Sequence, residues 1–152
     1  MTEYPREDRF IRFSLTMDTV LKRIQRYKND RLLDYGLKSM HLMPMYCLYR
    51  EPDGLTAVEL AKSCSVDKAF ISRVTGELRE LGYVEYSDAA SQYKKHLHLT
   101  DSGKNVMNSV NSIIANAVDK IRFGLSDDEL KIFYSVLAAF DNNLVALSCD
   151  NT

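Results

Sequence analysis

Residues 67–81, DKAFISRVTGELREL, constrain the fold most strongly, because they pair a regular apolar stripe with an unusual polar face. The stripe recurs at helical spacing and is predicted to pack inward; it consists of Ile71, Val74, Leu78 and Leu81. The opposite face carries small residues, a hydroxyl, two arginines and a glycine in mid-helix. That glycine costs about 1 kcal/mol in helix propensity, and core packing does not explain it. The pattern therefore indicates a function on the outward side of the helix.

The outward face suits a helix that enters the major groove of DNA. A groove about 12 Å wide admits a helix most easily when its outward face is slim, and Ala69 and Gly76 supply that slimness. Arg73 and Ser72 are donors for base edges or phosphates, and arginine to guanine is the commonest specific contact. The alternative is a solvated face with an incidental glycine, because charged helix faces are usually just solvated.

Neighbouring residues extend the DNA interpretation. Phe70 and the Ala69 methyl group can meet thymine methyl groups. Lys68 lies near the predicted helix N-terminus, where the helix dipole helps it to reach a phosphate. Asp67 is expected to cap the helix at its start, and Gly82 is expected to end it.

A short helix precedes this segment and a hairpin follows it. Thr56 and Glu59 stand at capping-box spacing in LTAVELAKSC, and their helix is expected to bury Val58, Leu60 and Ala61. After the segment, YVEYS and KKHLHL alternate polar and apolar residues, as the half-buried strands of a hairpin do. Helix, turn, helix and hairpin in this order predict a winged helix.

Amphipathic helices flank this block, so the predicted fold class is mainly α with a small β-hairpin wing. The first runs over 7–31 and the second over about 39–50, where Pro44 indicates either a kink or a later start. Two more follow within 101–147. The first helix and the last two carry more apolar surface than a small core buries, so we expect a homodimer. An intramolecular bundle is the alternative.

Several of these stretches also match a known pattern: the ELA helix, DKAFISRVTGELRELGYV, and the LTDSG that begins the next helix. Together they resemble the MarR (multiple-antibiotic-resistance regulator) family of winged-helix transcription factors over nearly the whole chain. The resemblance implies a recognition helix in the major groove and a wing over the minor groove. It implies one MarR-type chain over 1–152, with a winged helix-turn-helix lobe at 37–100 and N- and C-terminal dimerisation helices at 7–31 and 101–147.

The resemblance also implies a function. Family members repress or activate genes as homodimers on palindromic operators in double-stranded DNA, and often release DNA on binding a small molecule or on oxidation. We therefore expect a cytoplasmic, sequence-specific repressor that a small-molecule effector releases. A thiol-based redox sensor and a winged helix used only for protein contacts are the alternatives.

The expected wing departs from the family pattern, which often reads D-x-R-D-x-R at its tip. Ala90 and Tyr93 stand where arginines would, and an arginine in a narrow minor groove adds affinity and shape readout. Gln92, Lys94 and Lys95 are the candidate substitutes, or the wing binds weakly with a shallower salt dependence. The predicted DNA-binding residues are Thr56, Ser65, Asp67, Lys68, Ala69, Phe70, Ser72, Arg73, Gly76, Arg79, Gln92, Lys94 and Lys95.

The resemblance places an effector pocket where the dimer lobe meets the DNA-binding lobe, at MHLMPMYCLY. The predicted lining is Met40, His41, Met43, Met45 and Tyr46, an adaptable apolar set with polar handles. A Met-rich core beside a kinked helix is the alternative.

The sequence gives little support for disulfide, redox or metal chemistry at its cysteines and histidines. Cys47, Cys64 and Cys149 are widely spaced and odd in number, so they indicate neither a disulfide framework nor a metal-ligand pair. Oxidation of Cys64, just before the recognition helix, is the thiol-sensing alternative. His96 and His98 share a strand face, but no carboxylate or cysteine is spaced to complete a metal site with them.

Other classes of protein are excluded by what the sequence lacks. No nucleophile with a base, paired acid and base carboxylates or phosphate-cradling glycine loop indicates an enzyme, and no cofactor is expected. No apolar run is expected to reach the roughly 18 residues of a membrane span, and MTEYPREDRF lacks the apolar core of a signal peptide. Because the net charge is only −1, a DNA binder must localise its positive charge on one face.

Overall fold

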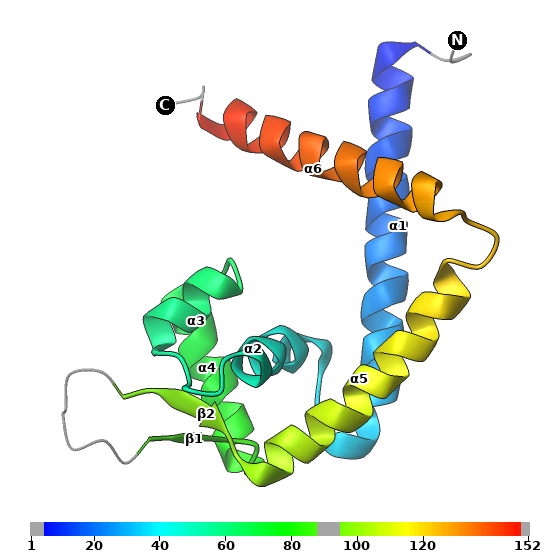
Figure 1. Ribbon diagram of the computed structural model, residues 1–152. Coiled ribbons are helices and arrows are strands. Elements are labelled where there is room, and N and C mark those ends of the chain that lie inside the picture. The colour runs from blue at the N-terminus through cyan, green and yellow to red at the C-terminus, as the bar shows by residue number, and fades with distance from the viewer. Residues whose placement is uncertain (1–4, 88–94, 150–152) are drawn as a thin grey trace. The chain divides into compact units, whose positions relative to one another are not determined.

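The computed structural model describes residues 5–87 and 95–149. These residues form six α-helices, a 3-10 turn and an antiparallel two-stranded hairpin, so the predicted fold class is confirmed. In chain order they are α1 (Arg6–Leu32), η1 (Leu33–Tyr35), α2 (Ser39–Arg50), α3 (Ala57–Ser63), α4 (Lys68–Glu80), β1 (Val84–Tyr86), β2 (Leu97–Leu99), α5 (Asp101–Ile121) and α6 (Asp127–Cys149) (Figure 1). The chain divides into two compact units within α5, after Ile113.

The core of the first unit forms where α2, α3 and α4 meet the hairpin and the first half of α5. Ile71, Val74 and Leu78 are fully buried on α4, and each such side chain contributes about 1.5–3 kcal/mol. The rest of the cluster comprises Leu32, Leu37, Leu42, Met45, Leu48, Leu60, Ala61, Val84, Leu97, Leu99, Val106, Met107 and Val110. Since α5 supplies three of these, the compact unit extends past position 100.

Two predicted core residues are exposed instead. Leu81 is 40% exposed because α4 ends at Glu80 and Leu81 is its C-cap. Val58, in the first turn of α3, is 64% exposed, whereas Leu60 and Ala61 are buried. Thr75 is buried although no apolar pattern marks it, and its hydroxyl donates a hydrogen bond of 2.7 Å to the Ile71 carbonyl. That bond removes the penalty of burying a polar group.

The hairpin is joined to the segment that precedes α3. Its register pairs Val84 with Leu99, which are both buried, and the exposed Tyr86 with the buried Leu97. Leu55 adds an antiparallel bridge to Leu97 through two hydrogen bonds of 2.8 and 3.1 Å. The base of the wing is therefore anchored on both sides.

Helix α2 continues through its proline. Pro44 is buried as the sixth residue of the helix, which begins at Ser39 as expected. A proline here removes one backbone donor and crowds the preceding turn. The contacts of its buried ring with the core offset part of this cost.

Helices α1 and α6 carry long apolar faces that are exposed. On α1 the exposed side chains are Phe10, Ile11, Leu15, Val20, Leu21, Ile24 and Tyr27. On α6 they are Ile132, Phe133, Tyr134, Val136, Leu137, Phe140, Leu144, Val145 and Leu147. Soluble monomers rarely expose apolar patches of this extent, which indicate interaction surfaces.

Helix α6 corrects one expectation, because residues Asp127–Leu147 are long and apolar enough to cross a membrane by length and composition. An 18-residue segment within this stretch has a mean hydropathy of 1.3, and none of it is buried. Asp141 lies four residues from the centre of this stretch, about 6 Å along the helix. An aspartate near the centre of a bilayer costs about 2.5–3.5 kcal/mol, and Asn142 and Asn143 follow it. The composition therefore also fits a helix that packs against protein.

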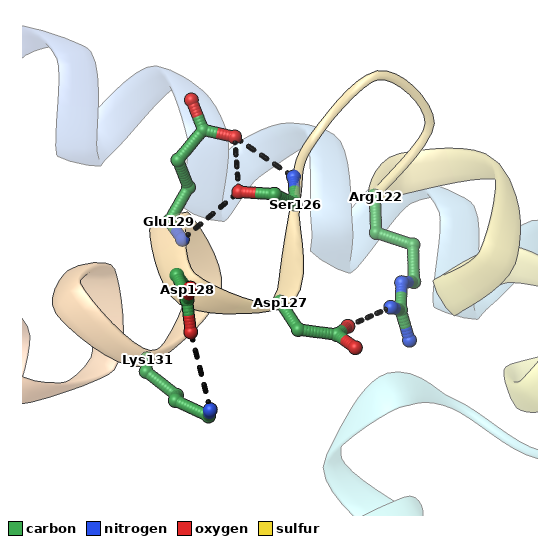
Figure 2. Close-up of polar contacts among 6 residues, drawn as sticks. All are labelled: Arg122, Ser126, Asp127, Asp128, Glu129 and Lys131. Carbon is green, nitrogen blue, oxygen red and sulfur yellow. Dashed lines mark hydrogen bonds and ion pairs between the residues drawn. The ribbon is translucent and has the colours of Figure 1, made fainter.

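Helix α6, in the second unit, begins with the predicted capping box, which the structure confirms (Figure 2). The backbone N–H of Ser126 donates to Glu129 Oε2 at 2.8 Å, and the N–H of Glu129 donates to Ser126 Oγ at 3.2 Å. The first of these bonds, with help from the Ser126 hydroxyl, lowers the pKa of Glu129. An ion pair of 2.5 Å between Arg122 and Asp127 spans the turn between the two helices (Figure 2).

Substitution by alanine is expected to have opposite effects on stability at Gly103 and at Gly76. A Cβ at Gly103 would overlap the carbonyl oxygen of Tyr83, whereas a Cβ at Gly76 would meet nothing within 4 Å. Gly103→Ala should therefore destabilise the protein by about 1–3 kcal/mol, and Gly76→Ala should stabilise it by up to about 1 kcal/mol. Denaturant unfolding at one fixed protein concentration measures both. A Gly103→Ala protein as stable as the wild type would contradict the close approach.

Candidate nucleic-acid interface

The turn between α3 and α4 is built by local capping. Thr56 and Glu59 form the predicted capping box, with the N–H of Thr56 donating to Glu59 Oε2 at 2.8 Å. Ser65 adopts a left-handed backbone conformation, with φ of 54°, which short polar residues tolerate better than bulky ones. Asp67 then caps α4 by accepting the backbone N–H of Phe70 at 2.7 Å. These contacts fix where α4 begins and which way it leaves the turn.

The side of α4 that faces away from the core has the predicted character. Lys68, Ala69, Ser72, Arg73 and Arg79 are exposed. Because Gly76 has open space where a side chain would stand, the middle of this face is thin. The donors on either side of the glycine can therefore approach a surface closely.

Aromatic rings orient the two arginines. The Arg73 guanidinium lies over the Phe70 ring at 5.5 Å, one turn back along α4. The Arg79 guanidinium lies over the Tyr86 ring of the hairpin at 4.7 Å, and the Lys95 amine lies 6.0 Å from the same ring. Such cation–π contacts contribute about 0.5–1 kcal/mol at exposed sites. They restrict the conformations of the arginine and lysine side chains without removing their positive charge.

A polar hollow of about 620 Å³ lies beside these residues at the base of the wing. It is lined by Arg79, Gly82, Val84, Glu85, Tyr86, Ser87, Lys95 and Thr100. The Ser87 hydroxyl is buried there without a hydrogen-bond partner among the described residues. The hollow thus combines two cations, Arg79 and Lys95, with the carboxylate of Glu85, so its lining carries both signs of charge.

The other predicted DNA-binding residues differ in what their side chains do. Asp67 and Thr56 use their side-chain oxygens to cap helices, whereas Ser65 is exposed in the turn. Gln92 and Lys94 lie outside the described residues. The structure thus brings together the donors of α4 and Lys95, and gives two of the remaining positions capping roles.

A polar cluster behind α4 escaped the sequence interpretation. Glu77 Oε2 accepts hydrogen bonds from the Lys38 amine at 3.1 Å and from the His41 ring at 3.0 Å. The His41 Nδ1 atom accepts the backbone N–H of Lys38 at 3.1 Å, so the ring proton lies on Nε2 and is donated to Glu77. These bonds link α2 to the middle of α4. Hydrogen bonds to Lys38 and then to His41 lower the pKa of Glu77.

The structure places the five predicted effector residues on α2, and they line neither the hollow beside the wing nor a second one near α5. His41 and Met45 are buried in the core, whereas Met43 and Tyr46 are exposed and Met40 packs at the edge. A second hollow of about 480 Å³ has a different lining, which is Leu48, Tyr49, Glu51, Pro52, Glu85, His98, Leu99, Lys104 and Asn108. The His41 ring links α2 to Glu77 of α4, and the place of these five residues in an effector pocket stays a prediction.

The cysteine environment argues against peroxide sensing by Cys64. Burial, and next the nearby Cys47 sulfur, raise the pKa of Cys64 to about 12. The thiolate is the reactive form of cysteine, and at neutral pH Cys64 is a thiol. No group of three or more possible metal ligands occurs in residues 5–87 and 95–149, so His96 and His98 complete no such site there.

Replacing Glu77 should change how stability depends on pH. Because the pKa of Glu77 is lower in the folded than in the unfolded chain, its stabilisation is present above about pH 4.5 and is lost as pH falls through the lowered value. We expect the gap in unfolding free energy between wild type and Glu77→Gln to be constant from about pH 8 to 5 and to shrink below that. Denaturant unfolding across this range measures the gap.

Glu80→Gln is the matched control, since Glu80 is an exposed carboxylate of the same helix without an ion pair to the described residues. It should show a smaller change at every pH. A Glu77→Gln gap that stays flat down to about pH 3 would contradict the assignment of the cluster.

Comparison with known proteins was made by sequence and by structure. No family model matches the sequence. The fold matches the Staphylococcus aureus MepR–DNA complex with a TM-score of 0.80 and 19% identity, over 87% of this chain and 97% of that one. A MarR-family transcription regulator matches with a TM-score of 0.82 and 19% identity, over 93% and 94%. A MarR protein from Peptoclostridium difficile matches with a TM-score of 0.79 and 16% identity, over 95% and 92%. The chain therefore has the winged helix-turn-helix fold of the MarR-family transcriptional regulators.

Proposed function

We propose that this chain is a MarR-family transcriptional regulator that binds double-stranded DNA as a homodimer and reads it with α4. The observation that carries the proposal is the thin, donor-bearing outer face of α4, with Gly76 between exposed arginines. The same fold occurs in a protein that was solved as a DNA complex. A regulator of this kind needs no catalytic group and acts in the cytoplasm.

The acidic residues near α4 fit this proposal. DNA binding requires positive charge next to phosphates, yet the chain as a whole has a net charge of −1. On α4 the carboxylate of Glu77 is paired with Lys38 and His41, and Asp67 at the N-cap is held by a backbone N–H. Lys68 and Arg73 then set the charge of the first turns of the outer face, whereas Glu80 is an exposed carboxylate at the C-terminal end of the helix.

The base of the wing supplies a second contact. Arg79 and Lys95 converge on Tyr86, and these two exposed cations at the base of the hairpin suit a backbone phosphate, since phosphate contacts position a protein on the duplex. This contact at the hairpin base replaces part of what arginines at the wing tip provide elsewhere in the family. Gln92 and Lys94 remain candidates for the rest.

The exposed faces of α1 and α6 are the proposed dimer surface. Two-fold pairing would bury apolar side chains that the single chain leaves in water. It would also present two copies of α4 to successive major grooves, about 34 Å apart, on a palindromic operator. Repression, and release by a small molecule, are the regulatory part of the proposal.

A winged helix used for protein contacts is the second candidate, favoured by the missing arginines at positions 90 and 93. A gel-shift assay with DNA from beside the gene separates the two candidates. A shift at low salt that unlabelled specific DNA competes supports the regulator. Absence of any shift supports the protein-contact module.

Arg73→Ala should weaken binding to a duplex selected from a random pool by about 1–3 kcal/mol, or roughly 5–150-fold in Kd, if Arg73 reads a base. It should also relax the base preference at one position of each half-site. Fluorescence anisotropy on the selected duplex and its single-base variants measures both effects. Lys131→Ala is the matched control, because Lys131 is an exposed cation on α6.

The pattern of loss separates two roles for Arg73. Equal weakening across all sequences, with a shallower salt dependence, would assign Arg73 to a phosphate. Unchanged binding would remove the outer face of α4 from the DNA interface.

Leu137→Glu should disrupt the proposed dimer. A carboxylate placed in an apolar interface costs about 2 kcal/mol or more, so the dimer dissociation constant should rise more than about tenfold. Sedimentation velocity measures the change against the 17.4 kDa chain mass. Ser135→Glu, on a polar position of the same helix, should leave the dimer intact.

A wild-type protein that sediments as a monomer would contradict the dimer. Recovery of the protein with membranes, rather than in the soluble fraction, would instead favour a membrane-spanning α6.

A further inference from the structure

Two cysteines that lie 17 positions apart in the sequence meet between α2 and α3. The Sγ atoms of Cys47 on α2 and Cys64 at the C-cap of α3 are 3.8 Å apart. Both side chains are partly exposed and pack against the edge of the core. A solvated ion can therefore reach the pair, while the two helices keep the two sulfurs close together.

The surroundings of the pair limit which ion it suits. No third histidine, cysteine or carboxylate joins it among residues 5–87 and 95–149. Structural zinc takes four protein ligands and catalytic zinc takes three. Calcium and magnesium take oxygen ligands. A site with two sulfur ligands therefore does not suit any of these ions. Soft thiolates without other donors select monovalent copper, which readily accepts two ligands.

The separation of the sulfurs fits such an ion. With metal–thiolate bonds of about 2.3 Å, a linear S–metal–S unit spans about 4.6 Å and a bent one spans less. The pair must therefore open by less than about 1 Å, which side-chain rotation at partly exposed positions provides.

We propose that Cys47 and Cys64 form a two-coordinate site for a soft monovalent cation of the Cu(I) type. On binding, two S–H bonds break, two S–Cu bonds form, and two protons pass to solvent, with no change of oxidation state. The charge of the ion offsets the repulsion between the two thiolates, which is part of what keeps the free pair protonated. The site does not depend on the proposed regulatory function.

The test uses the full-length reduced protein under anaerobic conditions. Cu(I), supplied as its acetonitrile complex, is titrated against a chromogenic Cu(I) chelator. We expect one Cu(I) per chain, and X-ray absorption should show two sulfur neighbours around the metal. Cys47→Ser and Cys64→Ser should each weaken binding at least about 100-fold, more than loss of an outer-shell partner usually causes.

Cys149→Ser is the matched control and should bind Cu(I) as the wild type does. Circular dichroism checks that each variant folds, and Cys47→Ala and Cys64→Ala replace any serine variant that does not. The proposal is overturned if the Cys47→Ser/Cys64→Ser double variant keeps its Cu(I), or if Cys149→Ser loses it. One Cu(I) per two chains with three or more sulfur neighbours would also overturn it, because the site would then be shared between chains.

Discussion

The burial of one side of α4 is the constraint on which the rest of the structure depends. Ile71, Val74 and Leu78 are completely enclosed by α2, α3 and the hairpin. A helix anchored at three positions on successive turns has no freedom to rotate about its axis. The residues on the other side are therefore fixed in direction, although none of them packs in the core. Packing of the buried side of α4 thus determines the direction of its outer face, which itself contributes little to stability.

Local sequence signals were sufficient for the helix boundaries and the outer face of α4. Capping at Thr56, Asp67 and Ser126 depends on residues three positions apart, so a short stretch of sequence contains the whole interaction. The order of helices and hairpin followed from periodicity for the same reason. Leu81 and Val58 were misassigned at helix ends, where periodicity does not tell which residues the core covers.

The contacts that sequence reasoning missed join distant parts of the chain. Glu77 binds Lys38, 39 positions away, and Cys47 meets Cys64 across 17. In the sequence alone, a glutamate that binds a buried histidine looks the same as a glutamate that is only solvated. His41 is a further example, because its burial and its bond to Glu77 could not be read from the sequence. Such pairs become visible only when the packing of α2 against α3 and α4 is known.

The bridge between Leu55 and Leu97 has a mechanical consequence. Because it fastens the described part of the hairpin to the residues that lead into α3, the base of the hairpin and the helix-turn-helix form one body joined by backbone hydrogen bonds. In a two-fold assembly, a shift of the supporting helices would then carry both copies of this body apart or together without deforming either. Control of DNA binding would then depend on the separation of these two bodies, which must match the spacing of successive major grooves.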